Sequence, residues 1–177
     1  MKKIFILFLF ISFTFPVLGQ MVNSKYEVHK AMKNLSAING RWEGRGWILN
    51  AMGKKSYSNV TENFQWKLDS TIIMVEGVGK KDDGTIVHNA LGIISYDIFK
   101  KKYSMNSYVA RGLSTNANFE VLEANKKFRW WFEDNSGGIF RYTTTTDSKH
   151  WKEEGEYSGD GKTWKKFFEM NLGKAAK

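Results

Sequence analysis

"NGRWEGRGWIL", residues 39–49, carries two tryptophans five residues apart, with glycines and charged residues between them. Alternate residues of a strand face opposite sides. Trp42 therefore shares one face with Gly44 and Gly46, which leave the wall bare above it for a bend or a ligand. Trp47 falls on the opposite face and needs cover from a helix or from a second subunit in a homodimer. A β-bulge at a glycine, turning both rings inward, is the alternative.

The spacing of the hydrophobic residues changes once near this stretch, from a helical period before it to a period of two after it. Residues 25–38 place Val28, Met32 and Leu35 on one face, which predicts a single helix. After residue 40 the pattern alternates with period two, as in Val60 and Phe64 among polar neighbours, which is typical of half-buried antiparallel strands. The predicted strands are residues 41–51, 56–68, 71–80, 85–98, 102–111, 115–123, 127–134, 138–146, 150–158 and 163–173.

The turns between these strands are short, so neighbours in sequence are predicted to pair. Ten such strands are too many for an open sheet, and we expect an all-β, up-and-down antiparallel barrel with the N-terminal helix capping its base. The first, third, fifth, seventh and ninth turns contain glycine and the other four do not. In a meander these two sets lie at opposite ends. The helix falls at the glycine-free end, so the glycine turns are predicted to form an open mouth.

Residues 1–19, MKKIFILFLFISFTFPVLG, read as a secretory signal peptide, with a charged start, an apolar middle and a small residue at the cleavage point. The apolar run is too short for a stable membrane anchor. Residues 20–177 then form one domain, periplasmic or secreted. There are no cysteines, and the net charge of +9 favours acidic partners. Export argues against a nucleic-acid partner.

"GRWEGRGW", "VHNALGIISYD", "FRWWFEDNSGGIFRYT" and "HWKEEGEYSGDGKTWKKFFEMNL" together resemble a bacterial lipocalin-like family of the calycin superfamily. That family has no settled function, and it is related in pattern to nitrobindin and fatty-acid-binding proteins. The resemblance covers almost all of residues 20–177 and implies a barrel around a ligand cavity. Nitrobindin binds haem through a late histidine, and His150 is the only late histidine here, so it is a weak haem candidate.

Charged or polar groups on apolar faces mark the candidate interior site, because an unpaired charge inside a barrel is costly unless it binds something. Glu62, Glu76 and Arg141 each share parity with apolar neighbours, and His88 shares parity with Ile86 and Ala90. These residues can equally face outward, and His88 can be a wall histidine. The predicted ligand-binding set is Trp42, Glu62, Phe64, Trp66, Glu76, His88, Trp130, Arg141 and Phe168.

These observations predict an exported barrel that binds a small apolar or amphipathic ligand. One alternative is a cavity enzyme, an isomerase or hydrolase that uses Glu62, His88 or Arg141. The other is a haem protein. The sequence has no Gly-x-Ser-x-Gly motif and no histidine pair spaced for zinc, so no catalytic or metal-binding residue is predicted. The Asp160-Gly161 pair of "SGDGKTW" is predicted to be a hairpin turn.

Overall fold

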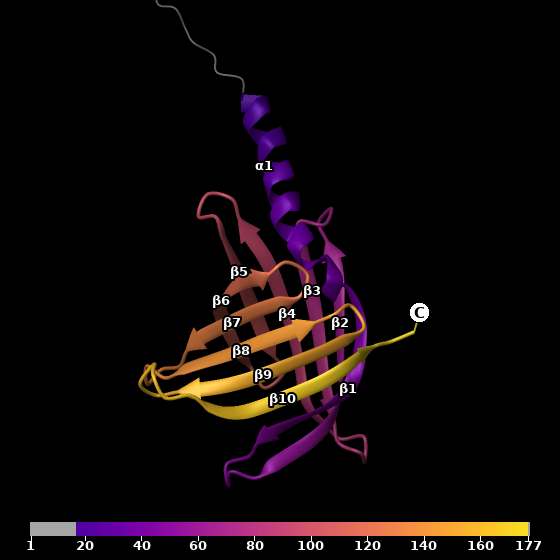
Figure 1. Cartoon of the computed structure of the whole chain (residues 1–177), viewed down its shortest axis with the longest axis vertical. Helices are drawn as coiled ribbons and strands as arrows, with labels where there is room; N and C mark the ends of the chain where they lie inside the picture. Colours follow the sequence, from indigo (N-terminus) through magenta and orange to yellow (C-terminus); the bar gives the residue numbers. More distant parts are fainter. Residues whose placement is uncertain (1–16, 177) are drawn as a thin grey trace, which may run out of the picture.

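A computed structural model describes residues 17–176, and the side chains of residues 24–176. Most of the predicted signal peptide lies outside this range. Ten antiparallel strands follow one another around a closed barrel, and β1 pairs with β10 to complete it (Figure 1). The prediction of a ten-stranded up-and-down barrel is confirmed. The strands are β1 (Gly40–Leu49), β2 (Lys55–Lys67), β3 (Ile72–Lys80), β4 (Ile86–Asp97), β5 (Lys102–Val109), β6 (Leu113–Glu123), β7 (Lys127–Glu133), β8 (Ile139–Thr146), β9 (His150–Ser158) and β10 (Lys165–Lys174).

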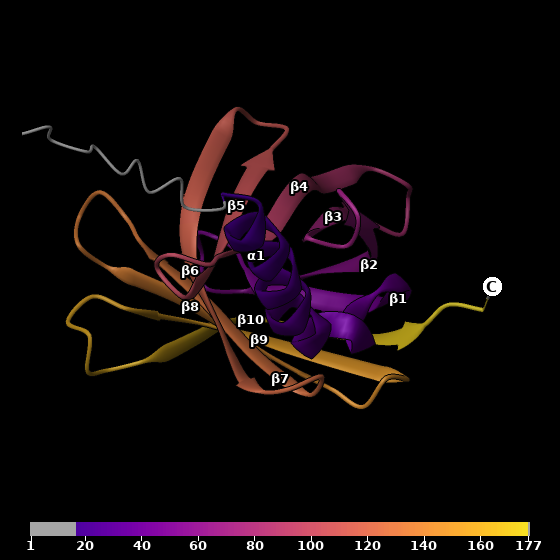
Figure 2. The same cartoon turned by 90° about the horizontal axis from the view of Figure 1, so that it is seen from above.

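The N-terminal segment rises from one end of the barrel, and Figure 2 looks down on that end. It is an α-helix, α1 (Val17–Met32), followed by a 3-10 helix, η1 (Lys33–Ile38). The expected single helix over residues 25–38 is therefore wrong in its second half. Bonds of the 3-10 type tighten a chain that is about to change direction, and here the amide of Asn39 donates to Ser36 O before β1 begins.

The last turn of α1 and η1 close the barrel. Met32 and Leu35 are completely buried and Ile38 is 1% exposed, all against the buried ring of Trp42. The Trp42 indole donates from Nε1 to the carbonyl of Ile38 at 2.8 Å, so its one polar group is satisfied. The ring also lies 5.6 Å from that of Trp151 on β9. Trp42 therefore points inward at the base of the barrel, as predicted, and packs there against η1 and the last turn of α1.

Along β1 the two tryptophans face opposite sides, as the alternation predicts. The strand pairs in continuous register with both neighbours, so there is no bulge. Trp47 lies outside and is covered by the Lys55 ammonium of β2, 3.9 Å from the ring centroid, and not by α1. Gly44 is needed for a close approach of β10, because a Cβ there would lie 2.2 Å from the carbonyl oxygen of Asn171.

The two ends of the barrel differ in their turns. Glycines with positive φ stand in all five turns of the mouth: Gly53, Gly84, Gly112, Gly137 and Gly161. The four turns at the helix end use non-glycine residues in the same left-handed region: Leu68, Asp69, Ser70, Lys101, Asn125 and Ser148. Some of these turns hold the helix. The Asn125 side chain accepts from the amide of Ala37 at 3.0 Å.

One of these left-handed residues offers a test of backbone strain. Lys101 has φ 51° and an exposed side chain. Lys101→Gly is expected to stabilise the protein by about 0.5–1 kcal/mol, because glycine removes the steric cost of this conformation and loses part of that gain to its greater freedom when unfolded. Urea denaturation measures the change. Lys100→Gly is the control: its φ is not positive and it loses the contact with Asp97 at 3.6 Å, so it should destabilise.

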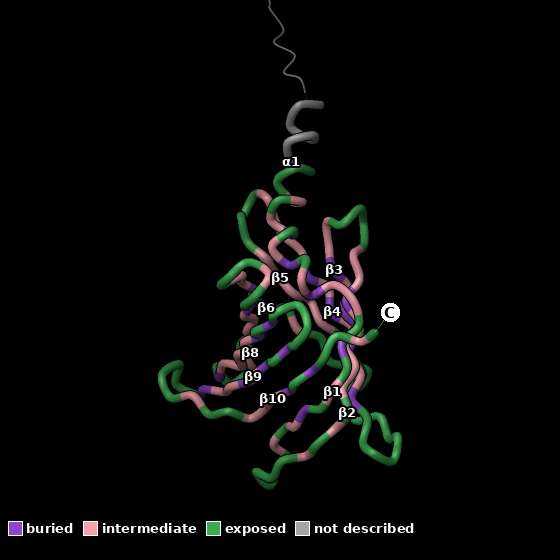
Figure 3. Tube along the Cα trace, turned by 45° about the vertical axis from the view of Figure 1, so that its right-hand side comes forward, coloured by how far each residue is buried: buried purple, intermediate pink, exposed green. Residues whose placement is uncertain are grey.

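The burial of side chains also differs between the helix end and the mouth of the barrel. Figure 3 shows buried segments beneath the helical segment and along the inner parts of the strands, whereas the hairpin tips are exposed. Inward-facing residues nearer the mouth keep part of their surface accessible, including Val60, Trp130 and Tyr142. The interior therefore has a packed base and a less tightly packed half that opens toward the glycine turns.

Candidate functional site

Strand register brings two glutamates to the inner face of the barrel. Glu62 on β2 lies opposite Trp42 on β1, whose ring is in the core. Glu153 on β9 lies opposite Thr144 on β8 and shares the parity of Trp151. Both carboxyls therefore stand just above the aromatic base. We call Glu62 and Glu153, with the donors around Glu153, the acid site.

Glu153 is only 7% exposed. The Thr144 hydroxyl donates to its Oε2 at 2.7 Å. The indoles of Trp130 and Trp151 also favour its ionised form, yet the buried Nε1–H of Trp151 makes no well-aligned hydrogen bond. The site therefore keeps one buried donor that is not fully used.

The Glu62 carboxyl lies against the backbone of β3 at Gly77, where there is no side chain. Its two carboxyl oxygens lie where a side chain of Gly77 on β3 would be, since a Cβ at Gly77 would stand 2.8 Å from both. Gly77 is directly opposite Glu62 in the β2–β3 register. The missing side chain thus makes the space in which this carboxyl lies.

Gly77→Ala is expected to push the Glu62 carboxyl off the wall, because atoms cannot remain at 2.8 Å from a methyl carbon. Overpacking of this kind costs roughly 1–3 kcal/mol. The variant should also shift the titration of Glu62, followed by NMR of the side-chain carboxyl carbons. Gly173→Ala on β10 is the matched control, since nothing lies within 4 Å of its added Cβ. An unchanged Glu62 titration in Gly77→Ala would show that the carboxyl is not held there.

Burial changes the acidity of both groups. It raises the pKa of Glu62 from 4.5 to about 8, and the nearby charge of Glu153 raises it further. Burial also raises the pKa of Glu153 to about 7, against the opposing effect of Thr144, Trp130 and Trp151. No lysine, arginine or histidine among residues 24–176 forms an ion pair with either carboxyl. Near neutral pH the pair therefore holds at least one proton.

An aromatic wall continues from the acid site toward the mouth. The rings of Trp130 and Tyr142 stack with centroids 3.9 Å apart and planes 4° from parallel. Phe168 on β10 packs edge-on against Tyr142 at 5.7 Å. Burial raises the pKa of the Tyr142 hydroxyl, and the charge of Glu153 raises it further, so this group is neutral at physiological pH. The wall offers flat apolar surface beside the two carboxyls.

Two basic side chains, His88 and Arg111, lie at the mouth. His88 faces inward on β4, opposite Gly79, but it is exposed at the rim. Partial desolvation lowers the pKa of its imidazole, and the charge of Arg111 in the β5–β6 turn lowers it further. Arg111 also acts on Tyr142, across the barrel from β4. His88 is thus a rim residue, separate from the acid site.

Two of the predicted site residues lie on the outside. Glu76 is exposed and accepts from the Asn63 side chain at 3.3 Å. Arg141 pairs with Glu156 at 2.8 Å and covers the Trp164 ring at 3.5 Å. Their apolar neighbours of the same parity face outward as well, so the expectation that either lines the interior is wrong. Neither can contribute to an interior site.

The other predicted residues divide between base and wall. Trp42 and Phe64 are core residues of the base, and Trp66 lies at the helix end beside a hollow of about 270 Å³ that His29 and Lys33 also line. Trp130 and Phe168 belong to the aromatic wall. The haem candidate His150 is exposed at the start of β9, with Nδ1 2.9 Å from Asp147, and does not face the interior.

Sequence reasoning missed most of the acid site. Glu153 shares parity with Trp151 and Gly155, so the alternation used for Glu62 also applies to it. The same alternation places Tyr142 on the face of β8 that carries Thr144. The unused donor of Trp151 and the space beside Gly77 depend on cross-strand neighbours, which the sequence alone does not give.

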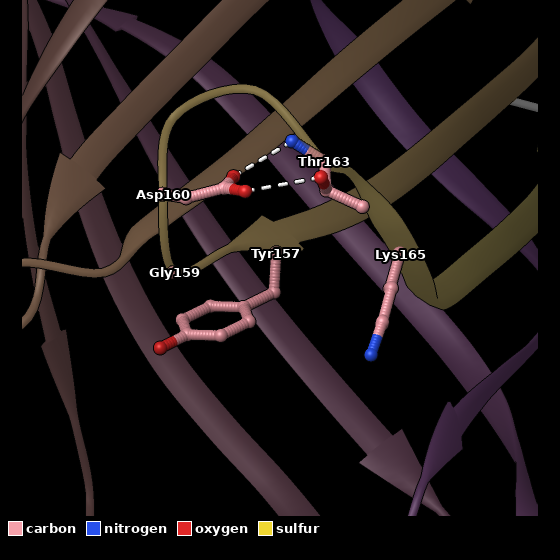
Figure 4. Close-up of a pocket in the computed structure, with 5 residues that line it drawn as sticks. All are labelled: Tyr157, Gly159, Asp160, Thr163 and Lys165. Carbon is pink, nitrogen blue, oxygen red and sulfur yellow. Dashed lines mark hydrogen bonds between the residues drawn. The ribbon is translucent and has the colours of Figure 1, made fainter.

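A second hollow, of about 450 Å³, lies on the surface at the β9–β10 turn (Figure 4). Its most polar feature is Asp160. This carboxylate already accepts from the amides of Lys162 and Thr163 and from the hydroxyls of Ser158 and Thr163. Those hydrogen bonds stay within the turn and lower the pKa of Asp160. The residue is a turn-forming one, as predicted from "SGDGKTW".

Comparison with solved structures shows that the fold is similar to that of Rv2717c from M. tuberculosis. The two structures align with a TM-score of 0.61 over 84% of this chain and 98% of the other, at 10% sequence identity. At that identity the likeness concerns the fold alone. No family model and no curated protein matches the sequence.

Two further features of the described residues bear on function. No helix in residues 17–176 has the length and apolar character to cross a membrane. The same part of the chain contains no cluster of three or more histidine and carboxylate side chains placed to hold a metal ion.

Proposed function

We propose that this protein binds a small amphipathic ligand inside the barrel, with the ligand's polar group at the acid site and its apolar part along the aromatic wall. The observation that carries the proposal is the pair Glu62 and Glu153, inward-facing and without a basic partner among residues 24–176. A buried charge without a partner is costly. A few polar groups in an otherwise apolar, concave surface are typical of small-molecule sites.

The ligand enters at the mouth. At the opposite end Met32, Leu35 and Trp42 are completely buried in the packed base. The mouth turns are built on glycines, and a Cβ added at Gly53 or Gly84 would meet nothing within 4 Å. Loosely packed hairpins open more readily than packed ones. Export to the periplasm or beyond, also proposed here, gives such a protein access to ligands outside the cytoplasm.

Native mass spectrometry of protein purified from its own host tests the proposal. We expect a co-purifying small molecule whose occupancy falls in Glu62→Gln and Glu153→Gln but not in Glu76→Gln, the matched exterior control. Hydrogen exchange should slow on binding in the turns around Gly53, Gly84 and Gly112, and stay unchanged at residues 100–102. Protection confined to residues 100–102 and 125–127 would place entry at the helix end and contradict the proposal.

A second candidate function is proton transfer on a bound substrate. Carboxyl groups with pKa values of about 7 and about 8 exchange protons most effectively near neutral pH, which suits an isomerase or hydrolase. Turnover of a co-purified ligand, lost in Glu62→Gln, would favour this function over simple binding. For the haem alternative, inward-facing His88 is the remaining candidate ligand, and a Soret band in purified protein would support it.

A further inference from the structure

We infer that the polar group recognised at the acid site is a protonated amine, so that the ligand is an amphipathic organic cation. The inference rests on the proposed function and names the class of ligand. Its basis is the pair of acidic groups inside the barrel, the aromatic surfaces around them and one buried donor that makes no well-aligned hydrogen bond.

Several glutamates on the outer surface have a basic partner, although Glu76 has only the Asn63 side chain. On the outer surface Glu120, Glu156 and Glu169 each have an arginine or lysine within 4 Å. The two inner glutamates have none among residues 24–176. A bound ammonium group would supply the missing charge and donate hydrogen bonds to both carboxyls, and charge-assisted bonds of this kind are the strong ones. A ligand carboxylate would instead add a third acidic group to the site and supply no positive charge.

The surfaces next to the acid site also suit a cation. Trp130 and Tyr142 present stacked rings, and the indole of Trp151 borders Glu153 from below. The faces of such rings attract cations by about 0.5–2 kcal/mol, more when water is excluded. A ligand with an alkyl or aryl chain gains apolar contact along the same wall, toward Phe168.

Trp151 adds a second geometric observation beside Glu153. The residue is 5% exposed and its Nε1–H makes no well-aligned hydrogen bond, although buried donors almost always make one. The indole lies close enough to Glu153 to favour the ionised carboxylate. When an ammonium group fixes Glu153 in that form, a small rotation of the carboxylate lets it accept from Trp151.

Binding of the amine then displaces a proton. In the empty barrel the pair Glu62 and Glu153 retains at least one proton near pH 7, as burial and mutual repulsion require. An ammonium ion between them favours loss of that proton. Other titratable groups near these carboxyls are the neutral hydroxyl of Tyr142 and, beyond it at the rim, Arg111 and His88. On the base side, the Lys174 ammonium lies 4.8 Å from the centroid of the Trp42 ring and donates to Ala37 O, and it forms no ion pair with either carboxyl. A neutral or anionic ligand would not release the proton.

Three probes of equal length test the inference: n-hexylammonium, n-hexanol and hexanoate, titrated at pH 7 and followed by calorimetry and tryptophan fluorescence. We expect n-hexylammonium to bind most tightly and to release close to one proton, measured from the heats in two buffers of different ionisation enthalpy. Glu62→Gln and Glu153→Gln should each weaken it about tenfold or more. Glu76→Gln and Glu154→Gln, both on the outer face, should not. Thermal melts confirm that each variant is folded.

The other outcomes separate the two proposals. If hexanol or hexanoate binds with the same dependence on Glu62 and Glu153 while the amine does not, the barrel is a ligand-binding protein and the amine inference is wrong. Amine binding that both Gln variants leave unchanged, or that releases no proton, also overturns it. If no probe binds, the charge of a co-purified host ligand decides, and a neutral or anionic one overturns it. If there is no such ligand either, the proposed function falls too.

Discussion

Trp42→Ala is expected to destabilise the protein by about 3–5 kcal/mol, as is typical for deletion of a large buried aromatic side chain. The ring is completely buried, packs against Trp151 at 5.6 Å and donates to Ile38 O. Its loss leaves a cavity between β1 and the plug of Met32 and Leu35. Urea denaturation followed by circular dichroism measures the change, which is a large part of a domain's total stability.

The same strand provides the control. Trp47 lies five residues on, faces outward, is half-buried and contacts the Lys55 ammonium. Trp47→Ala should cost about 1–2 kcal/mol, clearly less than Trp42→Ala, since it removes a partly exposed ring and one cation–π contact and leaves no internal cavity. Equal effects of the two substitutions would show that the base is not packed as described.

Stability should fall as the pH rises from about 5 to about 8. The pKa values of Glu62 and Glu153 are about 8 and about 7 in the folded protein, above the ordinary value of 4.5. The folded state therefore binds more protons than the unfolded state in this window, so the stabilisation is complete below 4.5 and is lost as the pH rises through the folded values. Each group contributes a slope of about 1.4 kcal/mol per pH unit where it is ionised only in the unfolded chain.

Glu62→Gln should flatten this profile, because it removes one buried acid and relieves the repulsion on Glu153. The variant is expected to be more stable than the parent at pH 8 by on the order of 3 kcal/mol, and closer to it at pH 5. Denaturation at pH 5, 6.5 and 8 makes the comparison. Glu76→Gln should reproduce the parent profile. A parent protein whose stability is constant from pH 5 to 8 would mean that the two carboxyls titrate normally.

The fold was predictable because its signals are local and repeated. The change of period after residue 40 and the alternation of glycine-containing turns together give strand number, direction and the end that the helix closes. The boundary between α1 and η1 was not predictable in this way, since 3-10 geometry depends on where Trp42 must be placed. The turns at the helix end were also unexpected, because Leu68 and Lys101 give no sequence sign of a left-handed backbone.

Only part of the candidate site could be predicted, because the alternation of residues along a strand does not identify the inner face. Alternation assigns residues to two faces but does not say which face is inside when both carry apolar groups. On β3 the outer face carries Met74 with Glu76, and on β8 it carries Ile139 with Arg141. Both therefore looked like interior residues. For Glu62 the same parity argument placed the residue inside, because Phe64 on its face belongs to the core cluster and Trp66 packs against that cluster.

The opposite placement of the helix and the glycine turns also makes this barrel suitable for engineering. The described chain begins and ends at the plugged end, where the amide of Ala175 donates to Arg41 O (Figure 1). Attachment through either terminus would therefore leave the mouth facing solution. Side chains added at Gly53, Gly84, Gly112 and Gly137 would meet no neighbouring atoms, although φ there is positive, so longer replacement loops suit these positions better than single substitutions. Four hairpins could thus be diversified around one fixed opening, as in a library of binding proteins, without altering the packed base.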